Sequence, residues 1–407
     1  YDMTGTMFEF SMLALKHDAM NIVESVNINF TFSFVSLLLL IGYIIFGSYV
    51  YKRIPAPIKH RSLLAVQSAA LACVLLAHGL IIGFTDFTRV RALVNKLYSD
   101  SENAYVDYGI LGNFTTEMYG GLLANRVLPL TNQEIGQLND FIYEKTSPQT
   151  AYTGVADGYN VVTVLCESFE WFSFMRNAVT YPNGFQCDES VLRALYPNLY
   201  EFYDSSVVAT NFHALEKTDI SENLSIIGNY PLEVFINYSY PKNELPYSLP
   251  NVLKNLYGVR SNSFHDGTNT FYNRNIHHVN ALGFESYTSA EAMFGEEQKS
   301  LGETNRDGEM IRACADAMFP TDRRFNTYIT TISMHGQYVH RPNFEKYYEK
   351  LKDIMLLPEG FDADSQAAQA LWYYCASAME LDDAVGEIMK ELRTRKDANG
   401  TPLLDKT

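Results

Sequence analysis

The sequence predicts an α/β domain built on a parallel sheet, preceded by two membrane-spanning helices and a helical stalk. Three observations lead to this fold class. Two long apolar segments without charged residues lie before position 86. A short β-branched run, Val161–Leu165, has the pattern of a strand buried on both faces of a parallel sheet. From Tyr159 onward, strand patterns alternate with helical patterns, as in α/β domains.

The two apolar segments predict membrane helices. Ser25–Tyr51 and Ser62–Thr85 each exceed the ~20 apolar residues that cross a bilayer. The alternative for both is a pair of buried core helices. The connecting loop, residues 52–61, contains four basic residues and no acidic one (Lys52, Arg53, Lys59 and Arg61). The positive-inside rule therefore places this loop in the cytoplasm, and the N-terminal residues 1–24 and the segment after position 85 outside.

Charge and cysteine content exclude two classes of protein. The formal net charge of −16 argues against a nucleic-acid-binding surface, which needs clustered basic residues. The five cysteines show no CxxC spacing, so neither a disulfide framework nor a zinc site is predicted. The sequence allows one or two disulfides outside the membrane, but it does not determine which cysteines pair.

The remaining elements follow in order. We expect residues 86–158 to form the helical extracytoplasmic stalk, with a helix over Gln133–Lys145 capped by Thr131 or Asn132. Residues 159–407 would form the α/β head. Within it, Asn326–Ser333 is a second buried strand, Gln366–Lys396 is a long helix, and the closing LLDKT leads into a further strand.

Two side chains are candidates for metal and phosphate chemistry. Glu167 follows the strand Val161–Leu165, and ligands of open α/β sheets bind beyond the carboxyl ends of strands. The alternative is a solvated loop acid. Thr218 stands just before a helix that should begin near Asp219, where free N–H groups and the helix dipole favour phosphate. The alternative there is a plain N-cap threonine.

A polar loop supplies further candidates. Phe264–Arg274 (FHDGTNTFYNR) brings together His265, Tyr272 and Arg274, and arginine can grip phosphate oxygens with two hydrogen bonds. The alternative is a surface turn with a structural arginine. His335, directly after the second strand, is a fourth candidate for the same pocket.

The ordered motifs ESFEW, KTDISENL, FHDGTNTFYNR, TTISMHGQY and ELDDAVGEIMKELR…LLDKT resemble the lipoteichoic acid synthase family. These enzymes are bacterial membrane phosphoglycerol transferases of the alkaline phosphatase and sulfatase superfamily. The likeness covers roughly Tyr159–Thr407. It implies an alkaline phosphatase-like sheet flanked by helices, in a multi-pass protein of the bacterial cell membrane whose catalytic domain is extracytoplasmic.

The resemblance also implies a site. The family holds one divalent cation, usually Mn²⁺, and oxygen and imidazole ligands suit Mn²⁺ or Mg²⁺. The family's metal ligands are a glutamate, the catalytic threonine and a later Asp-His pair, and Glu167 and Thr218 match the first two. The resemblance implies that Thr218 is the nucleophile, which takes glycerol phosphate from phosphatidylglycerol. A polyglycerolphosphate chain, a glycolipid or a glycan would accept it. His265, Tyr272, Arg274 and His335 match the positions that bind the headgroup.

Three departures from the family pattern are visible. Glu216 stands where the family usually has glycine, and Tyr272 stands where it commonly has tryptophan. The Asp-His pair that completes the metal site is expected beyond Thr407, so we expect residues 1–407 alone to bind metal weakly and to be inactive.

Other functions remain open at this stage. A phosphoethanolamine transferase also uses threonine, whereas a sulfatase needs a C/S-x-P-x-R motif that is not found near Thr218. A non-catalytic membrane scaffold with a degenerate head is a further alternative. Asn-x-Ser/Thr triplets occur at Asn113, Asn223 and Asn237, and would matter only in a host that N-glycosylates.

Overall fold

The computed structural model divides the chain into two compact units, Tyr1–Thr131 and Asn132–Thr407. It describes residues 131–144, 149–170, 189–209, 212, 217–229, 237, 243–295, 306–354 and 365–407, with a few helical residues between positions 41 and 73. Apart from those few residues, the predicted spans, 25–51 and 62–85, lie outside the described ranges, as does most of the predicted stalk. Among the residues so described, we find no helix that combines the length and the apolar character needed to cross a bilayer.

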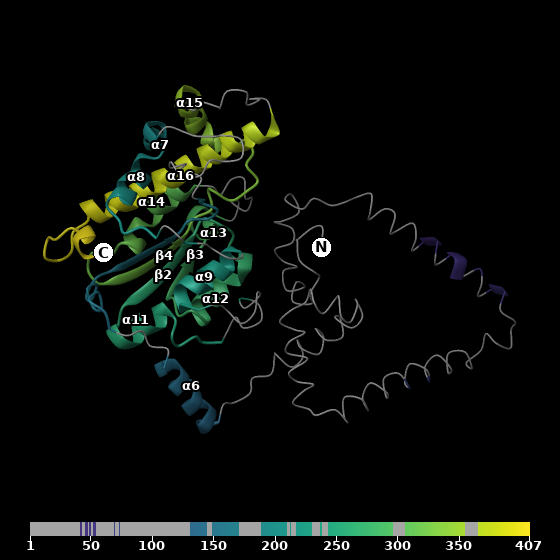
Figure 1. Ribbon diagram of the computed structural model, residues 1–407, viewed down its shortest axis with the longest axis horizontal. Coiled ribbons are helices and arrows are strands. Elements are labelled where there is room, and N and C mark those ends of the chain that lie inside the picture. The colour runs from purple at the N-terminus through teal and green to yellow at the C-terminus, as the bar shows by residue number, and fades with distance from the viewer. Residues whose placement is uncertain are drawn as a thin grey trace. The chain divides into compact units, whose positions relative to one another are not determined.

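The predicted parallel sheet is confirmed. Its four strands are β1 (Val161–Leu165), β2 (Arg260–His265), β3 (Ser286–Thr288) and β4 (Phe325–Thr330). They lie in the order β1-β4-β2-β3, and all three pairings are parallel (Figure 1).

One strand boundary predicted from the sequence is wrong. The second buried strand was expected over Asn326–Ser333, but β4 ends at Thr330. The backbone N–H groups of Ile332 and Ser333 donate to the carboxylate of Asp307, at 2.9 and 2.8 Å. Because this side chain takes the donors that a neighbouring strand would need, the chain leaves the sheet three residues early.

Helices surround the sheet. The long helix predicted over Gln366–Lys396 is confirmed as α16, which ends at Thr394 because Arg395 adopts an extended conformation. The closing LLDKT forms the 3₁₀ helix η5 (Leu403–Lys406). The other helices are α6 (Asn132–Glu144), α7 (Glu189–Leu195), α8 (Pro197–Asp204), α9 (Thr218–Ile227), α11 (Leu249–Tyr257), η3 (Phe271–Asn273), α12 (Arg274–Asn280), α13 (Ala290–Phe294), α14 (Asp307–Met318), η4 (Pro342–Phe344) and α15 (Glu345–Ile354).

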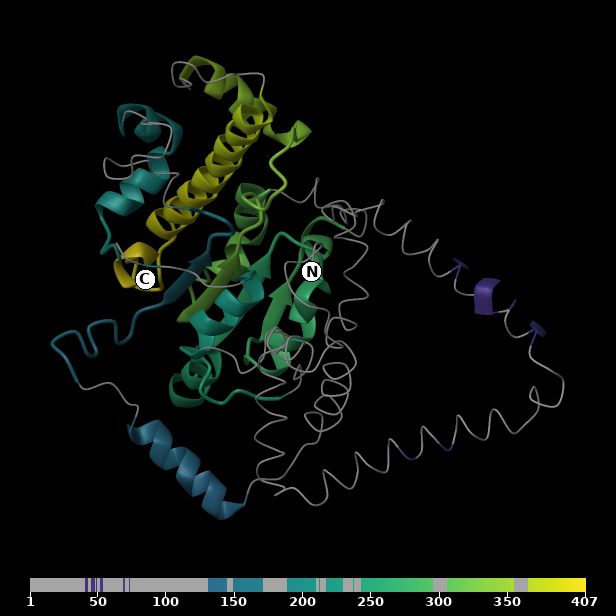
Figure 2. The same cartoon turned by 45° about the vertical axis from the view of Figure 1, so that its right-hand side comes forward.

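Alternation along β4 produces three layers, because successive strand residues face opposite sides of a sheet. Phe325 and Ile329 pack in one cluster with residues of α14 and α16. Tyr328 packs on the other side against Ile226 of α9. Figures 1 and 2 show α14 and α16 on one face of the sheet, and α9 and α12 on the other.

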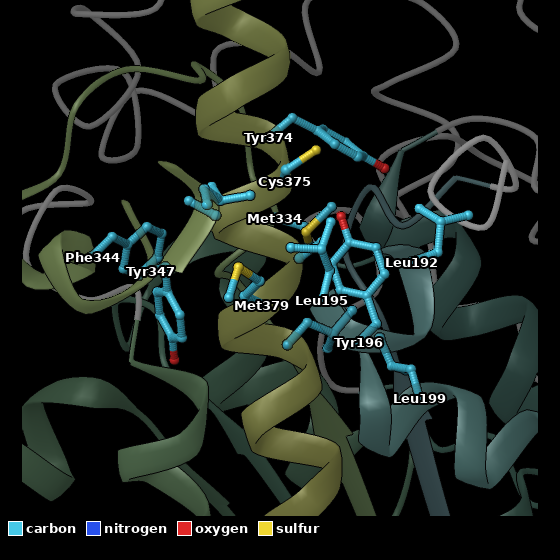
Figure 3. Packing of buried hydrophobic residues seen from close by; sticks show 14 of the residues in the cluster. Leu192, Leu195, Tyr196, Leu199, Met334, Phe344, Tyr347, Tyr374, Cys375 and Met379 are labelled. Atoms are coloured by element: carbon cyan, nitrogen blue, oxygen red, sulfur yellow. The ribbon is translucent and has the colours of Figure 1, made fainter. Parts of the chain in front are cut away.

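A second cluster covers the outer side of α16. It joins α7, α8 and α15 to this helix through leucines and aromatic rings, and Figure 3 shows them around Met379. Met334, from the loop after β4, is fully buried in the same cluster. The residue that precedes His335 is therefore anchored in the core.

Candidate active site

The carboxyl ends of three strands meet at one edge of the sheet. Leu165 of β1 and His265 of β2 both pair with Thr330 of β4. The residues that directly follow these strand ends therefore share one edge, which is where ligands bind in open α/β sheets.

Glu167 and Thr218 come into direct contact at this edge. The hydroxyl of Thr218 donates to Oε2 of Glu167, although 51 residues separate them. Glu167 is held in place by its own N–H, which donates to Oγ1 of Thr331 at 3.0 Å, and by the Ser168 hydroxyl, which donates to Oε1 at 2.8 Å. Oε1 is thus occupied by Ser168, while Oε2 faces Thr218.

Thr218 does not act as an N-cap. It is the first residue of α9, and Lys217 occupies the cap position without a side-chain cap bond. The N–H groups of Ile220 and Ser221 both bond to the Lys217 carbonyl. A hydroxyl at the first helical position lies beside the positive end of the helix dipole, which favours a bound phosphate.

Arg274 is buried, and it is paired with a carboxylate that our sequence analysis missed. Its Nε lies 3.0 and 2.9 Å from the two oxygens of Glu222, and both side chains are at most 2% exposed. The Thr330 hydroxyl donates to the same carboxylate at 2.7 Å. Burial disfavours the charge of Glu222, but Arg274 and His278 outweigh this effect and hold its pKa well below the ordinary value.

The spacing between Thr218 and Glu222 could have identified Glu222 as a candidate site residue. It follows Thr218 by four residues on α9, and side chains four apart lie on the same face of a helix. The pair therefore places the guanidinium of Arg274 under the helix face that carries Thr218. Its Nη1 is buried and has no hydrogen-bond partner among the described residues.

His265 lies in the same region and is neutral. Burial, followed by the charge of Arg274, lowers the pKa of His265 to about 3. Its Nδ1 lies 2.9 Å from the carbonyl oxygen of Thr330, which can only accept, so Nδ1 carries the proton. Nε2 is then an acceptor, suited to a hydroxyl group rather than to a phosphate oxygen.

Tyr272 stacks next to Arg274. The guanidinium carbon lies 5.0 Å from the centre of the Tyr272 ring, within the range of a cation–π interaction. Burial, followed by the charge of Asp219, raises the pKa of Tyr272, and Glu167 acts in the same direction. The structure thus brings together Glu167, Thr218 and Tyr272 with Arg274.

His335 sits on a loop held by Arg341. The guanidinium donates to the carbonyl oxygens of Ser333 and His335, at 2.8 and 2.7 Å, and is 7% exposed. Met334 anchors the same loop in the core. The position of His335 is therefore well defined, and its role in binding a headgroup stays a prediction.

The family follows from a comparison of the sequence with known protein families. Residues 159–403, more than half of the chain, match the family described as Sulfatase. The chain belongs to the sulfatase family. The superfamily expected from the ordered motifs is thereby confirmed.

Two solved structures resemble this sulfatase-family chain. One is the lipoteichoic acid synthase LtaP from Listeria monocytogenes, with 20% sequence identity and a TM-score of 0.46, covering 63% of this chain and 57% of that one. The other is the Streptococcus pyogenes phosphoglycerol transferase GacH in complex with sn-glycerol-1-phosphate, with 16% identity and a TM-score of 0.40, covering 65% and 64%. The chain thus spans less than two thirds of either structure. No curated protein matches it.

Sulfatase-superfamily enzymes typically use a divalent metal ion. The facing oxygens of Glu167 and Thr218 are hard ligands of the kind that Mg²⁺ and Mn²⁺ prefer. Across the ranges described above, no group of three or more histidine, cysteine or acidic side chains could hold a metal. The donor set therefore fits such an ion in type and would supply part of its coordination shell.

Two carboxyl groups of α16 contact Tyr347 in this sulfatase-family domain. Glu380 of α16 accepts from the Gly308 N–H at 3.0 Å, and burial raises its pKa to about 7. The Tyr347 hydroxyl lies 2.5 Å from Glu380 and 2.7 Å from Asp383. Because the hydroxyl has one proton and faces two carboxyl groups, a protonated Glu380 completes the network.

Proposed function

We propose that this chain is the anchored, catalytic part of a metal-dependent phosphoglycerol transferase that acts on phosphatidylglycerol outside a bacterial membrane. The observation that carries the proposal is the contact between the Thr218 hydroxyl and Oε2 of Glu167, at the start of a helix and above a buried arginine. A nucleophilic hydroxyl, a carboxylate that accepts its proton and a guanidinium for phosphate are the groups that this transfer needs.

In the proposed first step, Oγ1 of Thr218 attacks the phosphorus of phosphatidylglycerol, and its proton moves toward Glu167. The bond from phosphorus to the diacylglycerol oxygen breaks, the leaving oxygen takes a proton from water, and Glu167 returns the threonine proton to water. A bound divalent ion would neutralise negative charge on the phosphate and lower the pKa of the threonine hydroxyl. The product is glycerophosphoryl-Thr218.

In the second step, a hydroxyl of the acceptor attacks the same phosphorus and gives up its proton. The bond to Oγ1 breaks, and Thr218 regains a proton. The acceptor we propose is the end of a polyglycerolphosphate chain, a glycolipid or a glycan. Arg274 would hold the phosphate in both steps, while neutral His265 would accept a hydrogen bond from a glycerol hydroxyl.

Lipid turnover by the full-length protein in detergent with Mn²⁺ tests the proposal. Labelled phosphatidylglycerol and phosphatidylethanolamine are supplied separately to the wild type, T218A and T218S. We expect diacylglycerol from phosphatidylglycerol only, none with T218A, and reduced release with T218S, which keeps a hydroxyl. Mass spectrometry should find the glycerophosphoryl group on Thr218.

Two results would overturn the proposal. Release from phosphatidylethanolamine would assign the protein to the phosphoethanolamine transferases. No release from either lipid, combined with unchanged Mn²⁺ binding in T218A, would favour a non-catalytic scaffold.

A further inference from the structure

Two consecutive residues before Arg274 adopt an unusual backbone conformation. Tyr272 and Asn273 have φ angles of 54° and 52°, in the left-handed region that residues other than glycine rarely enter. Asparagine tolerates this region, whereas an aromatic residue adopts it at a cost of about 1–3 kcal/mol. Surrounding contacts must therefore hold Tyr272.

A single asparagine from a distant segment supplies these contacts. Nδ2 of Asn237 donates to the carbonyl oxygen of Tyr272 at 3.0 Å, and Nδ2 of Asn273 donates to the carbonyl oxygen of Asn237 at 2.8 Å. Asn237 is completely buried. It thus bonds to both left-handed residues at once.

The same side chain connects this loop to α9. Nδ2 of Asn223 donates to Oδ1 of Asn237 at 2.9 Å and to the Asp219 carbonyl at 2.7 Å. Asn223 belongs to the helix that begins with Thr218 and is also completely buried. A chain of two amides therefore joins the nucleophile's helix to the backbone of Tyr272.

The direction of every bond in this chain is determined. The Tyr272 carbonyl can only accept, so Asn237 presents its amide N–H to Tyr272 and its oxygen to Asn223. Oδ1 of Asn223 must then accept from Nε2 of His277, 2.9 Å away. Burial lowers the pKa of His277 to about 3, so the ring is neutral and its proton is on Nε2. Each donor in this network therefore has a defined acceptor.

We propose that Asn237 is a positioning residue that sets the place of the Tyr272–Arg274 wall relative to Thr218, and thereby sets how tightly the site binds a phosphate headgroup. The Tyr272 ring covers the guanidinium of Arg274, so a shift of this backbone moves both groups away from the phosphate. The expected change in KM rests on the proposed transferase function. The expected change in the position of the Tyr272 loop does not.

The first test compares Asn237→Ala with Asn251→Ala in the full-length protein. Asn251 is a matched control because it is also buried and donates to a backbone carbonyl, that of Leu245, while packing on Gly283 before β3. We expect N237A to raise KM for phosphatidylglycerol roughly five- to 100-fold, with a smaller effect on kcat. N251A should lower the unfolding temperature by a similar amount and leave KM unchanged.

The second test needs no catalytic activity. Hydrogen exchange of the peptide covering residues 271–274 should accelerate in N237A and stay unchanged in N251A. Asn273→Gly and Asn273→Ala remove the same side chain, but only glycine accepts a φ of 52° without strain. Both variants lose the bond to Asn237, so N273A, which also strains the backbone, should raise KM more than N273G does.

The outcomes separate the two proposals. Unchanged exchange over residues 271–274 in N237A, or equal KM values for N273G and N273A, would overturn the positioning role. Faster exchange in a protein that turns over neither lipid would support the positioning role and overturn the transferase function alone.

Discussion

The buried pair of Glu222 and Arg274 gives the sharpest prediction. Glu222→Gln keeps the volume and removes the charge, which leaves the guanidinium unpaired where it is 2% exposed. At 2.9 Å and an effective dielectric constant of about 20, the lost attraction is roughly 6 kcal/mol. Removing one partner of a buried pair costs about 3–5 kcal/mol after the solvation terms are included.

Thermal unfolding of the full-length protein, followed by intrinsic fluorescence, measures this cost. Each kcal/mol shifts the unfolding temperature of a domain of this size by roughly 2–4 °C, so E222Q should unfold roughly 6–20 °C below the wild type. Glu391→Gln is a matched control, because Glu391 pairs with Arg395 at 2.6 Å in a partly exposed position. It should shift the unfolding temperature by a few degrees at most.

The pair also predicts a pH dependence. The pKa of Glu222 is lowered on folding, so its contribution to stability is fully present above its unfolded value of about 4.3. This contribution is lost as pH falls from there toward the lower folded pKa. E222Q should lack this acid-dependent loss. Unfolding of E222Q within 2 °C of the wild type, or no lower than that of E391Q, would refute the buried-pair reasoning.

Two further predictions concern the surroundings of the site. A Cβ at Gly267 would lie 2.1 Å from Nε2 of His265, so Gly267→Ala should displace the imidazole and lower kcat/KM roughly 10- to 100-fold, as measured by lipid turnover. The pKa of Glu380 is raised to about 7, so the stability it contributes is greatest below pH 4 and falls as pH rises to 7. Glu380→Gln should abolish this slope and raise the unfolding free energy at pH 8 by about 3 kcal/mol, as measured by urea denaturation at pH 5 and pH 8.

The sequence was sufficient to predict the features that depend on local pattern. The β-branched run of β1 identified a buried strand, and the position of Glu167 just beyond it placed a carboxylate at the ligand-binding edge. The long helix α16 followed from its apolar spacing, with an error of two residues at its C-terminus. These features depend on periods of 2 and 3.6 residues, which a single sequence displays directly.

Features that depend on distant partners were not predictable in the same way. In the sequence, Glu222 is simply an acidic residue on a helix. Its partner Arg274 is 52 residues away, and only the folded structure brings the two side chains together. Asn237 was noted as part of an Asn-x-Ser triplet, but its side chain is completely buried and engaged in the core. The end of β4 was misplaced for a similar reason, because Asp307 takes its backbone donors.

Helix α9 makes several of the contacts between distant segments of the chain. Thr218 contacts Glu167 after β1, Glu222 holds Arg274 and the end of β4, and Asn223 reaches the Tyr272 loop through Asn237. A rotation of α9 about its axis would move the Thr218 hydroxyl, Arg274 and Tyr272 together. The positions of the Thr218 hydroxyl and of the Arg274 and Tyr272 side chains are thus coupled through one helix. The geometry that the proposed in-line attack at phosphorus needs therefore depends on the packing of α9 as well as on the loop sequences.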